Sequence, residues 1–204
     1  MKLFGITGGV GMGKSTDAQI LEKSGVVVVD TDVLSHRLTE SGQPALAEIS
    51  AKFGPTVLQA DGSLNRKELA RIVFSDDKAR ASLEAILHPK IRALWEAEVA
   101  RWRNEGRERG VVVIPLLFET ATEECFDATI CVACSTATQE KRLRDRGWTP
   151  EQITRRVAAQ WPVEQKIAKS DFVVWTDTVL EAAEAQLARI TDSADTRQKT
   201  PACA

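Results

Sequence analysis

The residues best suited to chemistry lie near the N-terminus, in the stretch GGVGMGKS from Gly8 to Ser15. Glycines let the backbone N–H groups of such a loop surround a phosphate, and a helix that starts there adds the positive end of its dipole. In this Gly-x-x-x-x-Gly-Lys-Ser pattern, Lys14 is expected to reach the β- and γ-phosphates of a nucleotide, and the Ser15 hydroxyl to bind Mg²⁺. The alternative is a glycine-rich turn that binds nothing. An apolar run before the loop and a helical pattern after it favour the nucleotide site.

Two acidic residues, Asp30 and Asp32, follow the next apolar run in the sequence VVVVDTD. Residues two apart in an extended segment point the same way, and ligands of α/β proteins bind at the carboxyl ends of strands. Both carboxylates could therefore face the terminal phosphate. A positioned aspartate can accept the proton of a hydroxyl that receives a phosphoryl group. The alternative is that these residues cap the helix that follows.

The phosphate loop alone does not name the reaction, because GTPases, motors and small-molecule kinases share it. The chain has no NKxD guanine signature and no DxxG after a strand, and a mechanical ATPase is more often larger. A compact kinase with a nucleotide lid fits better. Two alternatives stay open: another small P-loop kinase, acting on a nucleoside, nucleotide or sugar acid, and a nucleotide sensor without catalytic activity.

The elements that must position these residues follow from the hydrophobic pattern. Five short runs rich in β-branched residues are predicted strands, over 2–7, 26–30, 110–115, 127–133 and 171–175. Continuous apolar runs of this kind are typical of parallel strands buried on both faces. A crossover helix over Lys14–Ser24 joins the first two strands in a βαβ unit. The predicted fold class is therefore α/β, a three-layer P-loop NTPase fold in which helices flank a parallel sheet.

The chain is predicted to divide into a nucleotide-binding core and two helical excursions. The core comprises 1–33, 107–135 and 169–190, the excursion 34–106 is an insertion on the acceptor side, and 136–168 is a lid. Residues 191–204 are small and polar, which predicts a disordered tail.

Two helix starts are expected within these excursions. In the insertion, His88-Pro89 predicts a start for a helix over Pro89–Glu105, because proline suits the first helical position. In the lid, Thr149 to Gln152 match a capping box. Trp95 and Trp102, seven residues apart, are expected in the core rather than in a substrate platform.

The composition limits the partners of the chain. It has 204 residues, 43% of them hydrophobic and 27% charged, with a net charge of −2. This balance argues against a dedicated nucleic-acid binder or a polybasic membrane anchor. The N-terminal MKLFGI is too short for a signal peptide, and no apolar run could span a bilayer, so a cytoplasmic protein with a small-molecule substrate is expected. Cys131 and Cys134 lie in a predicted strand and are expected to be reduced and buried.

Several motifs occur in a characteristic order: ITGG, GKST, VDTD, ILHP, PLLFE (115–119), Gln139 with Arg142-Leu143, Gln160 and SDFVV (170–174). In this order they resemble the dephospho-CoA kinase family, over roughly residues 3–190. The resemblance implies ATP- and Mg²⁺-dependent phosphorylation of the ribose 3′-hydroxyl of dephospho-CoA, the last step of coenzyme A biosynthesis.

The resemblance also implies roles for single residues. Asp32 would be the catalytic base, Lys14 and Arg142 would act on the transferring phosphoryl group, and Ser15 would bind Mg²⁺. The ATP phosphates would be held by Gly11, Met12, Gly13, Lys14, Ser15 and Thr16. The acceptor would be contacted by Thr7, Asp32, His88, Leu116, Leu117 and Glu119.

Arg142 and Arg146 are one helical turn apart and could both turn toward phosphates, although a solvated helix face is the alternative for each. Met12 stands where the family commonly has serine, which need not matter if the backbone there binds the phosphates. After SDFVV the family pattern leads us to expect an asparagine near the adenine, but Trp175-Thr176 stands there, so no adenine contact is carried over.

Overall fold

The structure is a computed structural model that describes residues 1–193. It contains two compact units, one formed by residues 1–30 and those from 101 onward, the other by residues 31–100. The predicted tail over 191–204 lies mostly outside the described residues, but its first two residues continue helix α9 (Leu180–Asp192). The Thr191 side chain is buried there and donates a hydrogen bond to Leu187 O at 3.0 Å.

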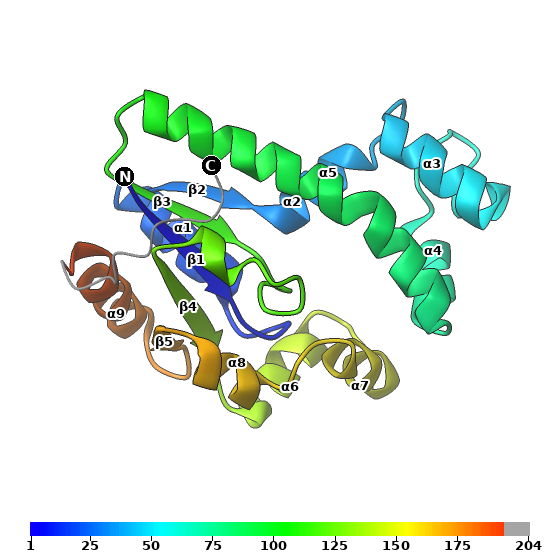
Figure 1. Cartoon of the computed structure of the whole chain (residues 1–204). Coiled ribbons are helices and arrows are strands. Elements are labelled where there is room, and N and C mark those ends of the chain that lie inside the picture. The colour runs from blue at the N-terminus through cyan, green and yellow to red at the C-terminus, as the bar shows by residue number, and fades with distance from the viewer. Residues whose placement is uncertain (194–204) are drawn as a thin grey trace. The chain divides into compact units, whose positions relative to one another are not determined.

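The first unit is built on a five-stranded parallel sheet with the strand order β2-β3-β1-β4-β5 (Figure 1). The strands are β1 (Lys2–Thr7), β2 (Val27–Asp30), β3 (Arg109–Val113), β4 (Ala128–Ala133) and β5 (Phe172–Trp175). All five predicted strands are confirmed to within two residues. The central strand β1 pairs with β3 on one side and with β4 on the other, so the loop that follows β1 leaves the middle of the sheet.

Helices cover both faces of this sheet, as the α/β prediction requires. On one face, α1 (Lys14–Lys23) and α9 pack on β1 and β4 through a common core that includes Phe4, Ile6, Leu21 and Leu187. The opposite face of β1 is so close to its cover that a Cβ atom on Gly5 would lie 2.6 Å from Leu117. The three-layer fold is therefore confirmed.

The segment between β4 and β5 forms three short helices, α6 (Thr136–Asp145), α7 (Pro150–Ala158) and α8 (Val163–Lys169). The predicted capping box is confirmed at the start of α7. The Thr149 N–H donates to Gln152 Oε1 at 3.0 Å, and the Gln152 N–H donates to Thr149 Oγ1 at 3.3 Å. The segment predicted as a lid thus consists of helices, and its middle helix α7 begins at a capping box.

The second unit is helical and has its own core. It contains α2 (Thr31–Leu38), α3 (Pro44–Phe53), the short 3-10 helix η1 (Pro55–Val57), α4 (Arg66–Val73) and most of α5 (Asp77–Asn104). The described residues 31–100 contribute no strand to the main sheet, as expected for an insertion. Their buried side chains include Leu46, Ile49, Val57, Leu64 and Leu69.

The predicted helix start at His88-Pro89 is wrong, because α5 already begins at Asp77 and Pro89 lies inside it. A proline within a helix leaves the carbonyl four residues earlier, here that of Ala85, without its helical hydrogen bond. The first half of α5 is held in place by packing, since Leu83, Ile86 and Leu87 lie against the core of the second unit. The free energy gained from this packing outweighs the free energy lost with the missing helical hydrogen bond. Trp95 and Trp102 are each 3% exposed, as expected for core residues.

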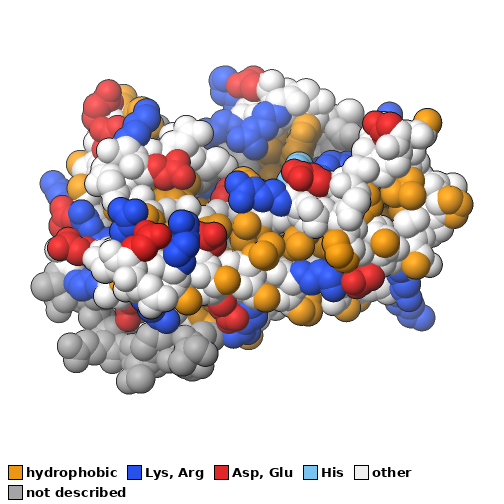
Figure 2. All heavy atoms as spheres, turned by 90° about the horizontal axis from the view of Figure 1, so that it is seen from above, with side chains coloured by type: hydrophobic (Ala, Val, Ile, Leu, Met, Phe, Trp, Pro, Cys, Tyr) orange, Lys and Arg blue, Asp and Glu red, His pale blue; other side chains and the backbone are white. Residues whose placement is uncertain are grey.

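The charged side chains are distributed without a dominant sign. On the face shown in Figure 2, lysine and arginine side chains are interspersed with aspartate and glutamate side chains, in keeping with the net charge of −2. Within residues 1–193, no helix has the length and apolar character required to cross a membrane.

Candidate active site

The glycine loop occupies residues 8–13, between the end of β1 and the start of α1. Some of the glycines in this loop are required by the fold itself, because the backbone there leaves no room for a side chain or has a positive φ. Gly8 has a φ of +139°, and a Cβ atom there would lie 2.2 Å from the backbone oxygen of Val132 in β4. Gly13, the residue before α1, has a φ of +110°. A side chain at Gly8 would thus push the loop away from the sheet before any ligand was involved.

The first turn of α1 presents the groups expected of a phosphate site. Lys14 donates hydrogen bonds from Nζ to the carbonyl oxygens of Gly8 and Gly9, both at 2.9 Å, so its ammonium group spans the loop. Ser15 and Thr16 are exposed beside it. An ammonium group and two exposed hydroxyls therefore stand at the N-terminal end of a helix, where anions bind favourably.

Ser15 fits a magnesium site of the kind used in phosphoryl transfer. Mg²⁺ commonly takes only one or two protein ligands and completes its coordination with water and phosphate oxygens. The exposed Ser15 hydroxyl on the first helical turn can supply such a ligand. No group of three or more histidine, cysteine, aspartate or glutamate side chains that could hold a metal occurs in residues 1–193, and a site of this kind does not need one.

The lid segment holds the glycine loop at Val10. The Val10 N–H donates to Gln160 Oε1 at 2.8 Å, and Gln139 Nε2 donates to the Val10 carbonyl at 2.8 Å. Gln139 is in α6, and Gln160 follows α7. Two residues of this segment, one before α7 and one after it, therefore contact a single residue of the loop.

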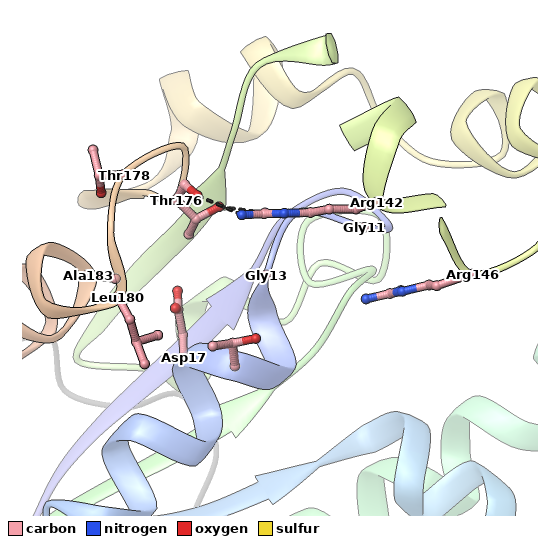
Figure 3. A pocket seen from close by; sticks show the side chains of 10 residues that line it. Gly11, Gly13, Asp17, Arg142, Arg146, Thr176, Thr178, Leu180 and Ala183 are labelled. Atoms are coloured by element: carbon pink, nitrogen blue, oxygen red, sulfur yellow. Dashed lines mark hydrogen bonds between the residues drawn. The ribbon is translucent and has the colours of Figure 1, made fainter. Parts of the chain in front are cut away.

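A cavity of about 270 Å³ adjoins the loop on the side of β4 and β5 (Figure 3). It is bordered by the loop and the first turn of α1, by α6 and the residue that follows it, and by the segment that leads from β5 into α9. Its lining residues are Gly11, Gly13, Thr16, Asp17, Arg142, Arg146, Thr176, Thr178, Leu180 and Ala183.

Arg142 is fixed at this cavity by the residue that follows β5. Its guanidinium donates to Thr176 Oγ1 at 2.9 Å and to the Thr176 carbonyl at 2.7 Å (Figure 3). The Thr176 hydroxyl in turn donates to the Met12 carbonyl at 2.8 Å. Thr176 thus joins the glycine loop to the lid arginine. Met12 takes part through its backbone, while its side chain is buried.

Asp17 is a buried acid in the same cavity. It is 1% exposed, and within residues 1–193 its Oδ2 atom has no hydrogen-bond partner. Burial raises the pKa of this carboxyl from 3.8 to about 7, and the positive charge of Arg142 opposes the rise. The sequence interpretation missed Asp17 because it follows the loop motif by one residue. The available signal was its spacing of three and four residues from Ile20 and Leu21, which puts an acid on the apolar face of α1.

In the segment after β3, two of the predicted residues, Thr7 and Glu119, are joined through the Pro115 carbonyl and Lys166. Thr7 Oγ1 donates to the Pro115 carbonyl at 3.1 Å, and Lys166 Nζ donates to the same oxygen at 2.6 Å. Lys166 also forms an ion pair with Glu119 at 2.8 Å, although its side chain is fully buried. Sequence reasoning missed Lys166 because its partners lie about fifty residues away.

The other residues predicted on the acceptor side differ in their burial and in the unit to which they belong. Leu116 is partly exposed, whereas the side chain of Leu117 is fully buried. Asp30 ends β2 in the first unit. Asp32, exposed in the first turn of α2, and His88, partly buried within α5, belong to the second unit.

The cysteines of the CVAC motif are poorly suited to nucleophilic chemistry. Cys131 and Cys134 are free, buried thiols in and just after β4, as expected from the sequence. Burial raises the pKa of Cys131 to about 11 and also raises the pKa of Cys134. Such thiols are poor nucleophiles because the thiolate is the reactive form.

A glycine loop of the phosphate-binding pattern after the central strand of a parallel sheet, with Arg142 of a following helix at the same cavity, is typical of P-loop kinases that act on small molecules. The comparisons with known proteins agree with this class. A family model described as Dephospho-CoA kinase matches residues 2–182. The chain therefore belongs to the dephospho-CoA kinase family, whose reaction is the phosphorylation of dephospho-CoA by ATP with Mg²⁺ in coenzyme A biosynthesis.

Individual relatives support the same assignment. A dephospho-CoA kinase of Anaeromyxobacter dehalogenans is 43% identical over 175 residues, which is 85% of this chain and 83% of the relative. One of Acinetobacter baylyi is 40% identical over 92% of this chain and 95% of its own. Among solved structures, a Thermus thermophilus protein is 34% identical with a TM-score of 0.78, covering 93% of this chain and 95% of its own. The Campylobacter jejuni dephospho-CoA kinase is 25% identical with a TM-score of 0.67, covering 93% of this chain and 96% of its own.

Proposed function

We propose that this site transfers the γ-phosphoryl group of ATP to the ribose 3′-hydroxyl of dephospho-CoA through Asp32, Lys14 and Arg142. The observation that carries the proposal is the cavity that Arg142 shares with Gly11, Gly13 and Thr16. A fixed guanidinium thus shares one cavity with the loop whose motif binds phosphates. Transfer of a phosphoryl group depends mainly on positioning and on stabilising negative charge, which such an arrangement supplies.

The order of the strands supports a division between donor and acceptor. The loop follows the central strand β1, and the cavity lies on the β4–β5 side. On the other side of β1 lie the segment after β3, with Leu116 and Glu119, and the carboxyl end of β2. The nucleoside of ATP would occupy the first side, and the acceptor would approach from the second.

Asp32 is the proposed base. It follows the carboxyl end of β2 by two residues and is exposed, so its carboxylate is accessible to a substrate hydroxyl. As the 3′-oxygen forms its bond to the γ-phosphorus, Asp32 accepts the hydroxyl proton, and the bond to the β-phosphate oxygen breaks to release ADP.

Positively charged groups would balance the negative charge of the transferring phosphoryl group. Lys14 would leave its carbonyl partners in the loop for the β- and γ-phosphates, and the backbone of residues 11–16 would hold the phosphate oxygens. Arg142 would stabilise the charge that develops on the transferring group, with Arg146 one turn further along. The Ser15 hydroxyl would bind Mg²⁺, an ion that would supply further positive charge to the phosphates.

Two segments complete the proposed division of the chain. Residues 136–168 would act as a lid that excludes water, which would otherwise hydrolyse ATP. Residues 34–106, including His88, would contact the acceptor. The core 1–33, 107–135 and 169–190 would supply Thr7, Leu116 and Glu119 to the acceptor side. Leu117, which is fully buried, would support this segment by packing.

We also propose a cytoplasmic enzyme with a small-molecule substrate and no nucleic-acid or membrane partner. The net charge of −2 and the interspersed charges support this assignment.

An acceptor screen tests the proposed reaction. Purified protein is supplied with Mg·ATP and, separately, with dephospho-CoA, a nucleoside, a nucleotide or a sugar acid, and ADP release is measured in a coupled assay. We expect release only with dephospho-CoA, with phosphorus NMR placing the new phosphate on the 3′-oxygen. The variant Lys14→Ala, with the same acceptors, controls for a contaminating kinase. ADP release with another acceptor and none with dephospho-CoA would refute the proposed substrate.

A further inference from the structure

Asp17 is the buried acid in the cavity that the mechanism above does not use. It is 1% exposed, and within residues 1–193 its Oδ2 atom has no hydrogen-bond partner. Figure 3 shows its carboxyl group directed from α1 toward the segment that carries Thr176 and Thr178. A buried polar atom without a partner costs free energy, so a group that satisfies it on binding gains a strong interaction.

The position of this atom limits what could satisfy it. The cavity continues from the glycine loop along the β4–β5 side of the site, away from the acceptor side. If the triphosphate lies on the loop, the remainder of the donor that can enter this space is its nucleoside. A carboxyl oxygen pointing into that space faces the edge of a base.

We propose that Asp17 selects the base of the phosphoryl donor, by accepting a hydrogen bond from the exocyclic amino group of adenine. The inference rests on the proposed function, because it takes the donor triphosphate to lie on the glycine loop.

The chemistry of the cavity suits an amino-bearing purine. A carboxyl oxygen accepts hydrogen bonds in either protonation state, and adenine carries a donor amino group at C6. Guanine and hypoxanthine carry a carbonyl oxygen at C6, which the ionised Asp17 carboxylate would repel. Among the other lining side chains, Arg142 and Arg146 are donors and Leu180 and Ala183 are apolar. The hydroxyls of Thr16 and Thr178 can accept hydrogen bonds, but both residues are exposed, whereas Asp17 is buried. The Thr176 hydroxyl is already bonded to Arg142 and Met12.

The proposal is tested by binding, without the acceptor. Isothermal titration measures the Kd of Mg·ATP and of the Mg²⁺ complex of purine riboside triphosphate, which lacks only the 6-amino group, for wild type, Asp17→Leu and Asp17→Asn. We expect the wild type to prefer ATP by about tenfold, the order of one hydrogen bond to a buried group. Asp17→Leu should bind ATP about tenfold more weakly and the analogue unchanged. Asp17→Asn, which keeps an acceptor oxygen, should retain most of the preference.

A control on the same helix separates this role from a general effect on α1. Gln19 is exposed, and Gln19→Leu should leave both affinities unchanged. Asp17→Leu should also unfold at a temperature no lower than the wild type, because it removes a buried acid whose Oδ2 is unpaired in the described part of the chain.

Two outcomes would overturn the proposal. Equal weakening of both nucleotides in Asp17→Leu would mean that Asp17 acts through the loop or Arg142, and no weakening would mean that it does not contact the base. Neither outcome depends on the acceptor. If wild type binds Mg·ATP with the expected preference but the screen yields no product from dephospho-CoA, the proposed substrate fails and the assignment of Asp17 stands.

Discussion

Gln160 Oε1 accepts a hydrogen bond from the Val10 N–H at 2.8 Å, across 150 positions of the chain. This contact joins the glycine loop to the residues between α7 and α8, while Gln139 of α6 donates a hydrogen bond to the Val10 carbonyl. The conformation of the phosphate loop and the placement of the lid helices are therefore linked through one loop residue.

Replacement of Gln160 by leucine should weaken the use of ATP. The Val10 N–H would lose its partner, and an unpaired backbone group in a partly buried site costs about 1–3 kcal/mol. We expect the kcat/KM for ATP to fall by roughly tenfold to a hundredfold, since about 1.4 kcal/mol corresponds to a factor of ten. Gln160→Glu, which keeps an acceptor oxygen, is the matched control and should lose much less. Equal activity of both variants and the wild type in steady-state assays would disprove the link.

The buried ion pair of Lys166 and Glu119 should matter for stability more than a neighbouring exposed pair. Lys166→Met leaves Glu119 without its cation, and breaking a buried pair in this way costs about 3–5 kcal/mol of the free energy of unfolding. Lys169→Met removes the cation of a pair with Glu123 whose lysine side chain is 47% exposed, and should cost no more than about 1 kcal/mol. Urea unfolding of both variants measures the difference. Similar losses for the two would show that burial of Lys166 carries no special weight.

The thiols of Cys131 and Cys134 should be unreactive in the native protein at pH 8. Burial raises the pKa of Cys131 to about 11 and raises that of Cys134, so both groups are almost wholly protonated at that pH. A raised thiol pKa means that the thiolate fraction grows only as the pH approaches the raised value. Peptide mapping after iodoacetamide treatment should find both residues unmodified in native protein and modified after unfolding in urea. Rapid labelling of the native protein at pH 8 would contradict this account.

The sheet and the phosphate loop could be predicted because their signals are local. The β-branched runs locate each strand to within two residues, and the loop motif locates the start of α1 at Lys14. The helix through Pro89 could not be predicted in this way. Its first half is held by contacts of Leu83, Ile86 and Leu87 with residues distant in the sequence, which a local proline rule does not take into account.

Contacts around the glycine loop that join distant segments of the chain could not be predicted from the sequence. Thr176 binds Met12 and Arg142 from positions 164 and 34 residues away. Lys166 reaches the Pro115 carbonyl from 51 residues away. Asp17 differs from both, because its spacing from Ile20 and Leu21 is a local signal that puts an acid on the buried face of α1.

The central claim is that Asp32 accepts the proton of the 3′-hydroxyl, and the kcat of Asp32→Asn with dephospho-CoA tests it most directly. An amide cannot act as the base but has nearly the same size, so we expect kcat to fall by about 10²–10⁴. The Kd of Mg·ATP, measured by titration of the same variant, should stay near that of the wild type. A kcat close to the wild-type value would contradict the assignment of Asp32 as the base.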